Sequence, residues 1–246
     1  MKQVSPHYVI IGNGRMASHI AHYFDDLSIT YHQWYRSAHN NAQLDEMLIH
    51  ATHVLLLISD KAIETFIQEH QLNKHQHLML IHFSGCLVSS YAYGAHPLQT
   101  FNQSMYASSE YPCIPFMIDE HAPDFSDLLP GLDNPHYRIP ASDKAYYHAM
   151  CVLSNNVSTL LWQKFYQEMK TRFDVRHEDL HPFLQRTCQN IQSDPASALT
   201  GPIARKDRET LERDLKALQG DPFYSVLKNI IHQFALGEEN EDSSGV

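Results

Sequence analysis

The sequence predicts an α/β fold, in which a doubly wound sheet forms the N-terminal part and an all-α domain follows it. Short apolar runs alternate with helical patterns as far as residue 140, whereas only helical periodicity is found from there to residue 236. Of the 246 residues, 43% are hydrophobic and 19% are charged, which is typical of a globular chain with a sizeable core. We therefore expect a sheet domain over residues 1–140, a helical domain over 141–236 and a disordered acidic tail over 237–246.

The predicted strands are short apolar runs that end in turn residues. The runs at 53–58 and 77–83 consist mainly of apolar side chains, as do parallel strands that are buried on both faces. Residues 94–101 (GAHPLQTF) are interpreted as an irregular loop. The other predicted strands cover residues 7–11, 29–35, 111–118 and 136–139.

The predicted helices have apolar residues at helical spacing. A long helix is expected to begin after the capping pair Ser142-Asp143 and to run to about residue 170. The other predicted helices cover residues 15–24, 42–50, 61–70, 124–131, 177–192, 207–219 and 222–235. No apolar run reaches the roughly 18–20 residues of a membrane-spanning helix, and the N-terminus lacks the pattern of a signal peptide.

The segment Gly12–Ala17 has the spacing G-x-G-x-x-A between a predicted strand and a predicted helix. In a dinucleotide site the first glycine permits a tight turn, and the second lets the backbone approach a pyrophosphate. The small Ala17 allows close packing of helix on strand, and the helix N-terminus offers free N–H donors. The alternative is a plain glycine turn without a ligand.

The end of the second predicted strand indicates which dinucleotide binds. An NAD site has an Asp or Glu there, whereas this sequence has Arg36 and Ser37, which suit a 2′-phosphate. His39 is a possible further contact, and the alternative for Arg36 is a solvated loop arginine. We therefore expect NADPH as the cofactor. The predicted cofactor-binding residues are Gly12, Asn13, Gly14, Arg15, Met16, Arg36, Ser37, Ser59 and Ser84.

The long helix of the second part carries no charged residue from Ala145 to Gln163, so we expect it to be covered on most sides. Lys144, His148 and Asn155 fall, with Cys151, within a stripe roughly 60° wide. The opposite side is apolar. This stripe favours an active-site wall with Lys144, His148 and Asn155 as catalytic residues, and the alternative is a polar seam against the first domain.

Two further segments carry candidate chemistry. Ser84-Gly85-Cys86 closes a buried strand at its carboxyl end, where open α/β sheets bind ligands, and His96 in the loop that follows is a candidate for substrate binding or proton donation. Thr200 and Arg205 lie in a Gly-Pro loop between helices, where Arg205 can hold a substrate carboxylate and Asp207 can cap the next helix. In both segments the alternative is a structural loop.

Charge and cysteine usage exclude several classes of function. A net charge of −10 argues against nucleic acid as the main partner. Four scattered cysteines without a C-x-x-C pair indicate free thiols in a reducing cytoplasm, and neither they nor the 18 dispersed histidines form a metal motif. We expect a cytoplasmic protein with no metal and no membrane partner.

The order of these motifs along the chain resembles that of a known group of proteins. The sequence is similar to short two-domain Rossmann-like reductases related to pyrroline-5-carboxylate reductase and the β-hydroxyacid dehydrogenases. Within that group it resembles a family with the patterns Y-H-A-x-x-x-x-S-N and L-T-G-P-x-x-R-G-D, some members of which act as an alternative type of ketopantoate reductase. The matching segments are GNGRMA, HFSGC, GAHPLQTF, KAYYHAMCVLSNN and ALTGPIARKD.

Two positions depart from these patterns. Lys206 stands where the family pattern has glycine, which puts the conformation of the Arg205 loop in question. His148 stands where β-hydroxyacid dehydrogenases carry asparagine, so that only Lys144 carries over from their Lys–Asn pair, as an analogy.

We therefore expect an NADPH-dependent reductase of a small 2-oxo acid, with 2-dehydropantoate (ketopantoate) as the expected substrate, in pantothenate synthesis. Lys144 or His148 would protonate the developing alkoxide, and Asn155 would orient the substrate. The alternatives are a reductase of a cyclic imine or another keto acid, and a non-catalytic NADP(H)-binding sensor. A homodimer joined through the helical domains is expected, because one sheet domain cannot cover the uncharged helix.

Overall fold

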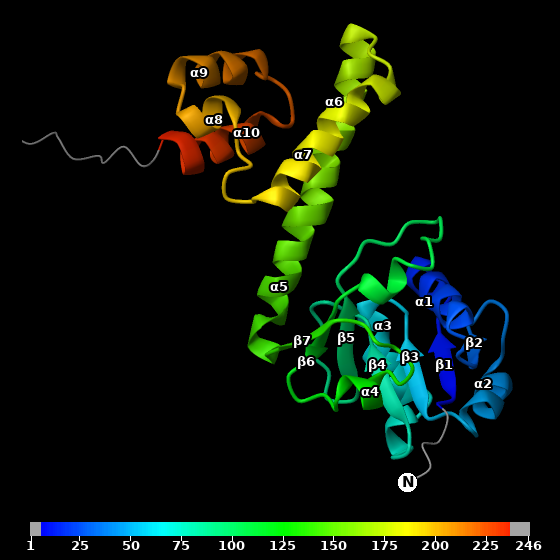
Figure 1. Cartoon of the computed structure of the whole chain (residues 1–246). Coiled ribbons are helices and arrows are strands. Elements are labelled where there is room, and N and C mark those ends of the chain that lie inside the picture. Colours follow the sequence, from blue (N-terminus) through cyan, green and yellow to red (C-terminus); the bar gives the residue numbers. More distant parts are fainter. Residues whose placement is uncertain (1–5, 237–246) are drawn as a thin grey trace, which may run out of the picture. The chain divides into compact units, whose positions relative to one another are not determined.

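A computed structural model describes residues 6–236 (Figure 1), so the tail predicted at 237–246 lies outside the described residues. By its internal contacts the chain divides into two compact units between Leu161 and Trp162. The last strand ends at Ile139, close to the predicted end of the sheet domain. The first unit nevertheless continues to Leu161, because the first helix after the sheet packs against the sheet's polar edge.

The first unit contains a seven-stranded sheet in the order β2-β1-β3-β4-β5-β6-β7. The first five strands are parallel, β6 is antiparallel to β5, and β7 is parallel to β6. β1 lies between β2 and β3, so the chain changes direction across the sheet at β1 and β3, where doubly wound sheets bind ligands. The predicted fold class is confirmed. The strands are β1 (Tyr8–Ile11), β2 (Tyr31–Trp34), β3 (His53–Leu56), β4 (Met79–His82), β5 (Tyr93–Pro97), β6 (Phe116–Asp119) and β7 (His136–Ile139).

The strand β5 corrects the sequence analysis, which interpreted residues 94–101 as a loop. Gly94 and Pro97 have low strand propensity, but β4 and β6 pair with β5 from either side, so its tertiary context decides. The strand predicted at 111–118 begins only at Phe116, because Tyr111–Cys113 form a 3-10 turn.

Helices cover both faces of the sheet. α1 (Arg15–Asp26) and α4 (Phe125–Leu128) contribute to one core, in which Phe24 and Leu128 pack with strand residues such as Ile10. α2 (Asn41–Leu48) and α3 (Asp60–Glu69) supply the other core through Leu44 and Ile63. Neighbouring residues of β1, Ile10 and Ile11, point to opposite cores, as strand geometry requires.

A long run of helix leaves the sheet after Asp143. It consists of α5 (Lys144–Cys151), a π-helical segment (Val152–Val157) and α6 (Ser158–Phe173), whereas the sequence predicts one regular helix. The stretch expected to be covered is open in the single chain. Leu153 and Leu160 are 55% and 54% exposed.

The second unit is helical. A cluster of buried residues, Leu211, Ile231 and Ala235, joins its last helices. The short helix α8 is absent from the sequence prediction. Asp207 caps the following helix as predicted, because its carboxylate accepts the Thr210 N–H at 3.2 Å. The helices after α6 are α7 (His181–Ser193), α8 (Gly201–Arg205), α9 (Arg208–Ala217), α10 (Tyr224–Ile231) and a π-helical turn (His232–Leu236), and further 3-10 turns cover Leu72–Lys74, Ala141–Asp143 and His177–Leu180. Within residues 6–236, no helix combines the length and the apolar character needed to cross a membrane.

Candidate active site

The turn after β1 needs glycine at its first position. Gly12 has a φ of 129°, which side chains rarely adopt, and an added Cβ would lie 2.3 Å from the carbonyl oxygen of Leu57. Its N–H donates to the Trp34 carbonyl at 2.9 Å, and its own carbonyl accepts from Gln33 Nε2 at 2.8 Å. The turn is therefore fixed between β2 and β3, as the predicted tight turn requires.

The second glycine of the motif, unlike the first, lies beside open space. Gly14 is exposed at the N-cap of α1, and an added Cβ would meet no protein atom within 4 Å. The cap has no side-chain hydrogen bond, and the first turn has no acidic residue. Free N–H groups at a helix N-terminus suit a phosphate, which makes this open space a fitting place for one.

The other motif residues surround this space. Asn13 and Arg15 are exposed, Met16 is half-buried, and the small Ala17 is buried in the core. The fit of Ala17 beneath the strand matches its predicted packing role.

Arg36 and Ser37 lie in the turn that follows β2, and both are exposed. Because β1 and β2 are neighbouring parallel strands, this turn and Gly12 lie at the same edge of the sheet. His39 is turned inward, where Nδ1 accepts the Tyr35 N–H at 3.3 Å. The structure thus leaves Arg36 and Ser37 available at the edge where a cofactor's ribose phosphate would lie.

Ser59 and Ser84 follow the third and fourth strands at that edge. Ser59 is exposed at the N-cap of α3, while Ser84 is buried and its Oγ donates to Asp60 Oδ2 at 2.6 Å. Ser84 Oγ also accepts the Leu87 N–H at 3.0 Å. Ser84 therefore shapes the loop after β4, and Asp60 is a site residue that the sequence analysis did not single out.

The predicted catalytic residue Lys144 lies in a buried ion pair. Lys144 is 3% exposed, and its Nζ donates to Asp119 Oδ1 at 2.6 Å. The other oxygen, Asp119 Oδ2, accepts the Gly94 N–H at 2.5 Å. An added Cβ on Gly94 would lie 2.5 Å from Lys144 Nζ, so the glycine makes room for the pair. The pair fixes the start of α5, and the proton-donor role of Lys144 stays a prediction.

Two imidazoles approach Gly85 in the loop after β4. His148 lies one turn further along α5 than Lys144, and His96 lies in β5. An added Cβ on Gly85 would lie 2.7 Å from His148 Cδ2 and 3.2 Å from His96 Nε2. His96 Nδ1 is 2.7 Å from the Tyr147 hydroxyl. Burial lowers the pKa of His96 to about 4, with the nearby His148 charge acting in the same direction. The structure therefore brings the predicted residues His96 and His148 together with Tyr147, which the sequence analysis missed.

A third histidine lies behind this cluster. His82 is fully buried at the end of β4, where Nδ1 accepts the Ser84 N–H at 3.3 Å. Its Nε2 has no hydrogen-bond partner among residues 6–236. Burial lowers the pKa of His82 to about 4, and the Lys144 charge contributes to the same shift. A neutral His82 therefore adds no charge to the cluster at neutral pH.

The remaining predicted residues belong to other elements. Asn155 is exposed in the π-helical segment of the first unit. Thr200 and Arg205 are exposed at the two ends of α8 in the second unit. Lys206, which replaces the family's glycine, has a left-handed backbone with a φ of 53°, the conformation that glycine adopts most easily. Their predicted roles in substrate binding stay predictions.

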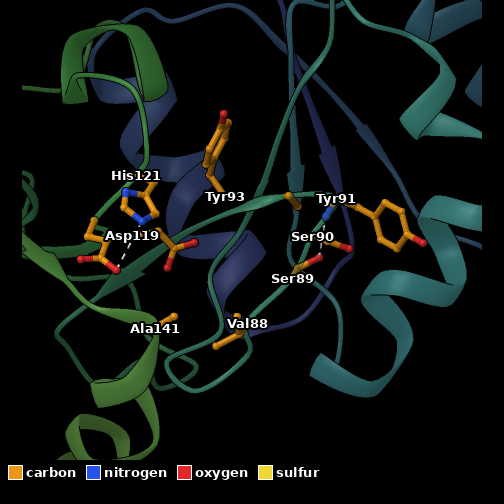
Figure 2. A pocket seen from close by; sticks show the side chains of 10 residues that line it. Val88, Ser89, Ser90, Tyr91, Tyr93, Asp119, His121 and Ala141 are labelled. Carbon is orange, nitrogen blue, oxygen red and sulfur yellow. Dashed lines mark hydrogen bonds and ion pairs between the residues drawn. The ribbon is translucent and has the colours of Figure 1, made fainter.

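A separate hollow of about 300 Å³ lies beside Asp119 (Figure 2). Tyr93, His121, Val88 and Ala141 surround it in the view, and the ten described residues that line it include two acids but no lysine or arginine. Such a lining does not suit a phosphate or a carboxylate. Within the described residues, no group of three or more His, Cys, Asp or Glu side chains is arranged to hold a metal ion.

Signals for the missed residues were present but weak. Asp119 follows a predicted strand and is next to Glu120, and Tyr147 stands beside His148 in the uncharged helix. Neither belongs to a spacing motif, because their partners Lys144 and His96 are 25 and 51 residues away in the chain.

Solved structures of other proteins share this fold. A presumed NADP oxidoreductase from Bacteroides fragilis is 19% identical, with a TM-score of 0.72 over 93% of this chain and 98% of that one. A protein from Thermotoga maritima is 18% identical, with a TM-score of 0.63 over 91% and 97% of the two chains. An imine reductase from Myxococcus stipitatus, solved in complex with NADP+, is 13% identical, with a TM-score of 0.60 over 94% and 96%.

A family model described as a domain of unknown function, DUF2520, matches residues 115–231. No curated protein matches the sequence. At these identities the structural matches establish the fold, a Rossmann-like sheet followed by helices, in which other proteins carry NADP-dependent reductase chemistry.

Proposed function

We propose that this chain is an NADPH-dependent reductase of a small carbonyl or imine compound. The observation that carries the proposal is the Gly12–Ala17 turn, in which the missing side chain of Gly14 faces open space at a helix N-terminus. This open space beside free helix N–H groups can accept a pyrophosphate. Arg36 at the same edge favours the phosphorylated form of the cofactor.

The residues present fit this cofactor. The backbone from Gly12 to Met16 would hold the pyrophosphate, Arg36 and Ser37 would hold the 2′-phosphate, and Ser59 would border the path between them. When bound, NADPH supplies a hydride. In this sheet the remaining ligand would lie toward β4 and β5, where His96 and His148 face the loop after β4.

The proposed substrate is 2-dehydropantoate, a small 2-oxo acid, with Arg205 and Thr200 as the residues that hold its carboxylate and Asn155 as an orienting amide. Guanidinium groups bind carboxylates in a bidentate manner, which supports Arg205 for this role. A cyclic imine or another keto acid is the second candidate. The imine reductase named among the structural matches supports it.

A substrate panel tests the proposed function. The full-length chain is incubated with NADPH and, in turn, with 2-dehydropantoate, other 2-oxo acids and cyclic imines, and the loss of NADPH absorbance is followed. Turnover of 2-dehydropantoate above that of the other compounds is the expected result. Turnover of an imine alone would replace the substrate, and NADPH binding without turnover on the whole panel would support a non-catalytic sensor instead.

The choice of cofactor is predicted to depend on Arg36. Arg36→Ala removes a charge-assisted hydrogen bond to the 2′-phosphate and should weaken NADPH binding by about 1.5–3 kcal/mol. NADH lacks this phosphate, so its affinity should not change. Titration of the wild type and the variant with both cofactors measures the effect. Equal affinity of the wild type for NADH and NADPH would contradict the prediction.

A homodimer is the proposed assembly. Leu153, Leu160 and Leu161 are 55%, 54% and 39% exposed on a stretch of helix that carries no charge from Ala145 to Gln163. Apolar surface of this kind is usually covered by a second subunit. Light scattering at micromolar concentration should give twice the mass of the chain, and Leu153→Glu with Leu160→Glu should shift it to that of a monomer. A monomeric wild type would rule out this assembly.

A further inference from the structure

We propose that His96 delivers the proton to the product through Nε2, and that Tyr147 holds His96 in the required tautomer and replaces that proton through Nδ1. The inference rests on the proposed reductase function and names the proton donor of that site. It assigns the donor to residues that the sequence motifs did not indicate as a pair.

The geometry gives the two nitrogens of His96 different tasks. Nδ1 is anchored 2.7 Å from the Tyr147 hydroxyl, whereas no hydrogen bond of Nε2 is found within residues 6–236. Nε2 lies over Gly85, where an added Cβ would come within 3.2 Å of it. Gly85 directly follows Ser84 at the carboxyl end of β4, the edge that the proposed cofactor occupies. One nitrogen is thus held by the protein, and the other is presented where a substrate would lie.

Acid strength decides which of the two partners donates in the anchored bond. A phenol O–H is a stronger hydrogen-bond donor than a neutral imidazole N–H, and an imidazole nitrogen is a better acceptor than a phenol oxygen. Tyr147 therefore donates its O–H to Nδ1, which places the only ring proton of neutral His96 on Nε2. Burial lowers the pKa of His96 and raises that of Tyr147, so both groups are neutral at pH 7.

The other candidate donors are less suited. Lys144 uses its ammonium group to neutralise Asp119, and losing a proton would leave that carboxylate without its partner. His148 contacts the space above Gly85 with a ring carbon, Cδ2, and no hydrogen bond fixes its ring in the described part of the chain. His96 is the group whose orientation is fixed and whose second nitrogen is available.

The proposed reaction transfers one hydride and two protons. When NADPH supplies its hydride, the carbonyl carbon would gain a C–H bond and the carbonyl oxygen would become an alkoxide. That oxygen takes the proton of Nε2–H, while Nδ1 takes the proton of the Tyr147 hydroxyl. After the transfer, water reprotonates Nε2 and the Nδ1 proton returns to the tyrosinate, which restores both groups. Two protons move in one chain, which a single donor such as Lys144 would not require.

A solvent-isotope experiment distinguishes a relay of two protons from a single proton donor. Turnover of the substrate identified by the panel is measured in mixtures of H2O and D2O for the wild type, Tyr147→Phe and Tyr146→Phe, the last being a matched control because Tyr146 is 71% exposed. The wild type and Tyr146→Phe should show a curved dependence of kcat on deuterium fraction, from two protons in flight. Tyr147→Phe should lower kcat by about 10–100-fold and make the dependence linear.

A second substitution checks the donor itself. His96→Gln should lower kcat by about 10²–10⁴-fold, the range for losing a positioned acid, with the affinity for NADPH kept. A linear dependence in the wild type, or an unchanged one in Tyr147→Phe, would overturn the relay while leaving the reductase function intact. A wild type that turns over nothing on the panel overturns the reductase function.

The tautomer can be tested without any turnover. Nitrogen-15 NMR of the histidine rings, with His96→Gln to assign the signal, should show His96 protonated at Nε2 and not at Nδ1 between pH 6 and 8. Tyr147→Phe should shift this signal toward a mixture of tautomers. A His96 ring protonated at Nδ1 in the wild type would overturn the inference whether or not a substrate is known.

Discussion

Replacing Lys144 by methionine is expected to lower the free energy of unfolding by about 2–4 kcal/mol. The substitution leaves Asp119 without the ammonium group that it contacts at 2.6 Å, and removal of one member of a buried ion pair is costly because the other charge stays behind. Asp119 has 22% of its side chain exposed, so the expected loss is somewhat below that of a fully buried pair. Urea denaturation monitored by circular dichroism measures it.

A double substitution separates structure from catalysis. Lys144→Met with Asp119→Leu removes both charges, and it should regain most of the lost stability, since a buried pair can be replaced by apolar groups at little cost. If Lys144→Met instead kept full stability while kcat fell by about 10²–10⁴-fold, Lys144 would be the proton donor that the sequence motif indicates.

Alanine at the two glycines of the β1–α1 turn is expected to affect stability very differently. Gly12→Ala forces a side chain into a backbone with a φ of 129° and against the carbonyl oxygen of Leu57. The backbone strain costs about 1–3 kcal/mol, and overpacking costs a similar amount. Gly14→Ala meets no protein atom, so its melting temperature should stay within about a degree or two of the wild type.

Thermal denaturation of both variants in the absence of cofactor is the measurement. A clear loss of stability in Gly12→Ala with an unchanged Gly14→Ala is the expected outcome. Equal destabilisation by both would mean that Gly14 serves the fold, and its open space would then no longer point to a ligand.

Local signals predicted the conformation of the β1–α1 turn well. The glycine spacing of Gly12 and Gly14 depends on backbone conformation and close approach, which act over a few residues and leave a readable pattern. The same is true of Asp207, whose capping bond to Thr210 spans only three positions. Alternating strands and helices likewise gave the correct fold class, because each element buries its own apolar face.

Features that depend on distant partners were predicted poorly. β5 contains Gly94 and Pro97 and becomes a strand because β4 and β6 pair with it. Asp119, 25 residues before Lys144, forms an ion pair with it that the sequence analysis did not predict. The Tyr147–His96 contact joins residues 51 positions apart. Spacing within one segment carries no information about such pairings.

Calorimetric titration of the full-length chain with NADPH tests the proposed cofactor site most directly when the wild type and Gly14→Ala are measured side by side. We predict saturable binding of one NADPH per wild-type chain, and at least about tenfold weaker binding by a Gly14→Ala variant of unchanged stability, because the added methyl group occupies the space of the pyrophosphate. No heat of binding from the wild type, or equal affinity in the two proteins, would contradict a cofactor site at this turn.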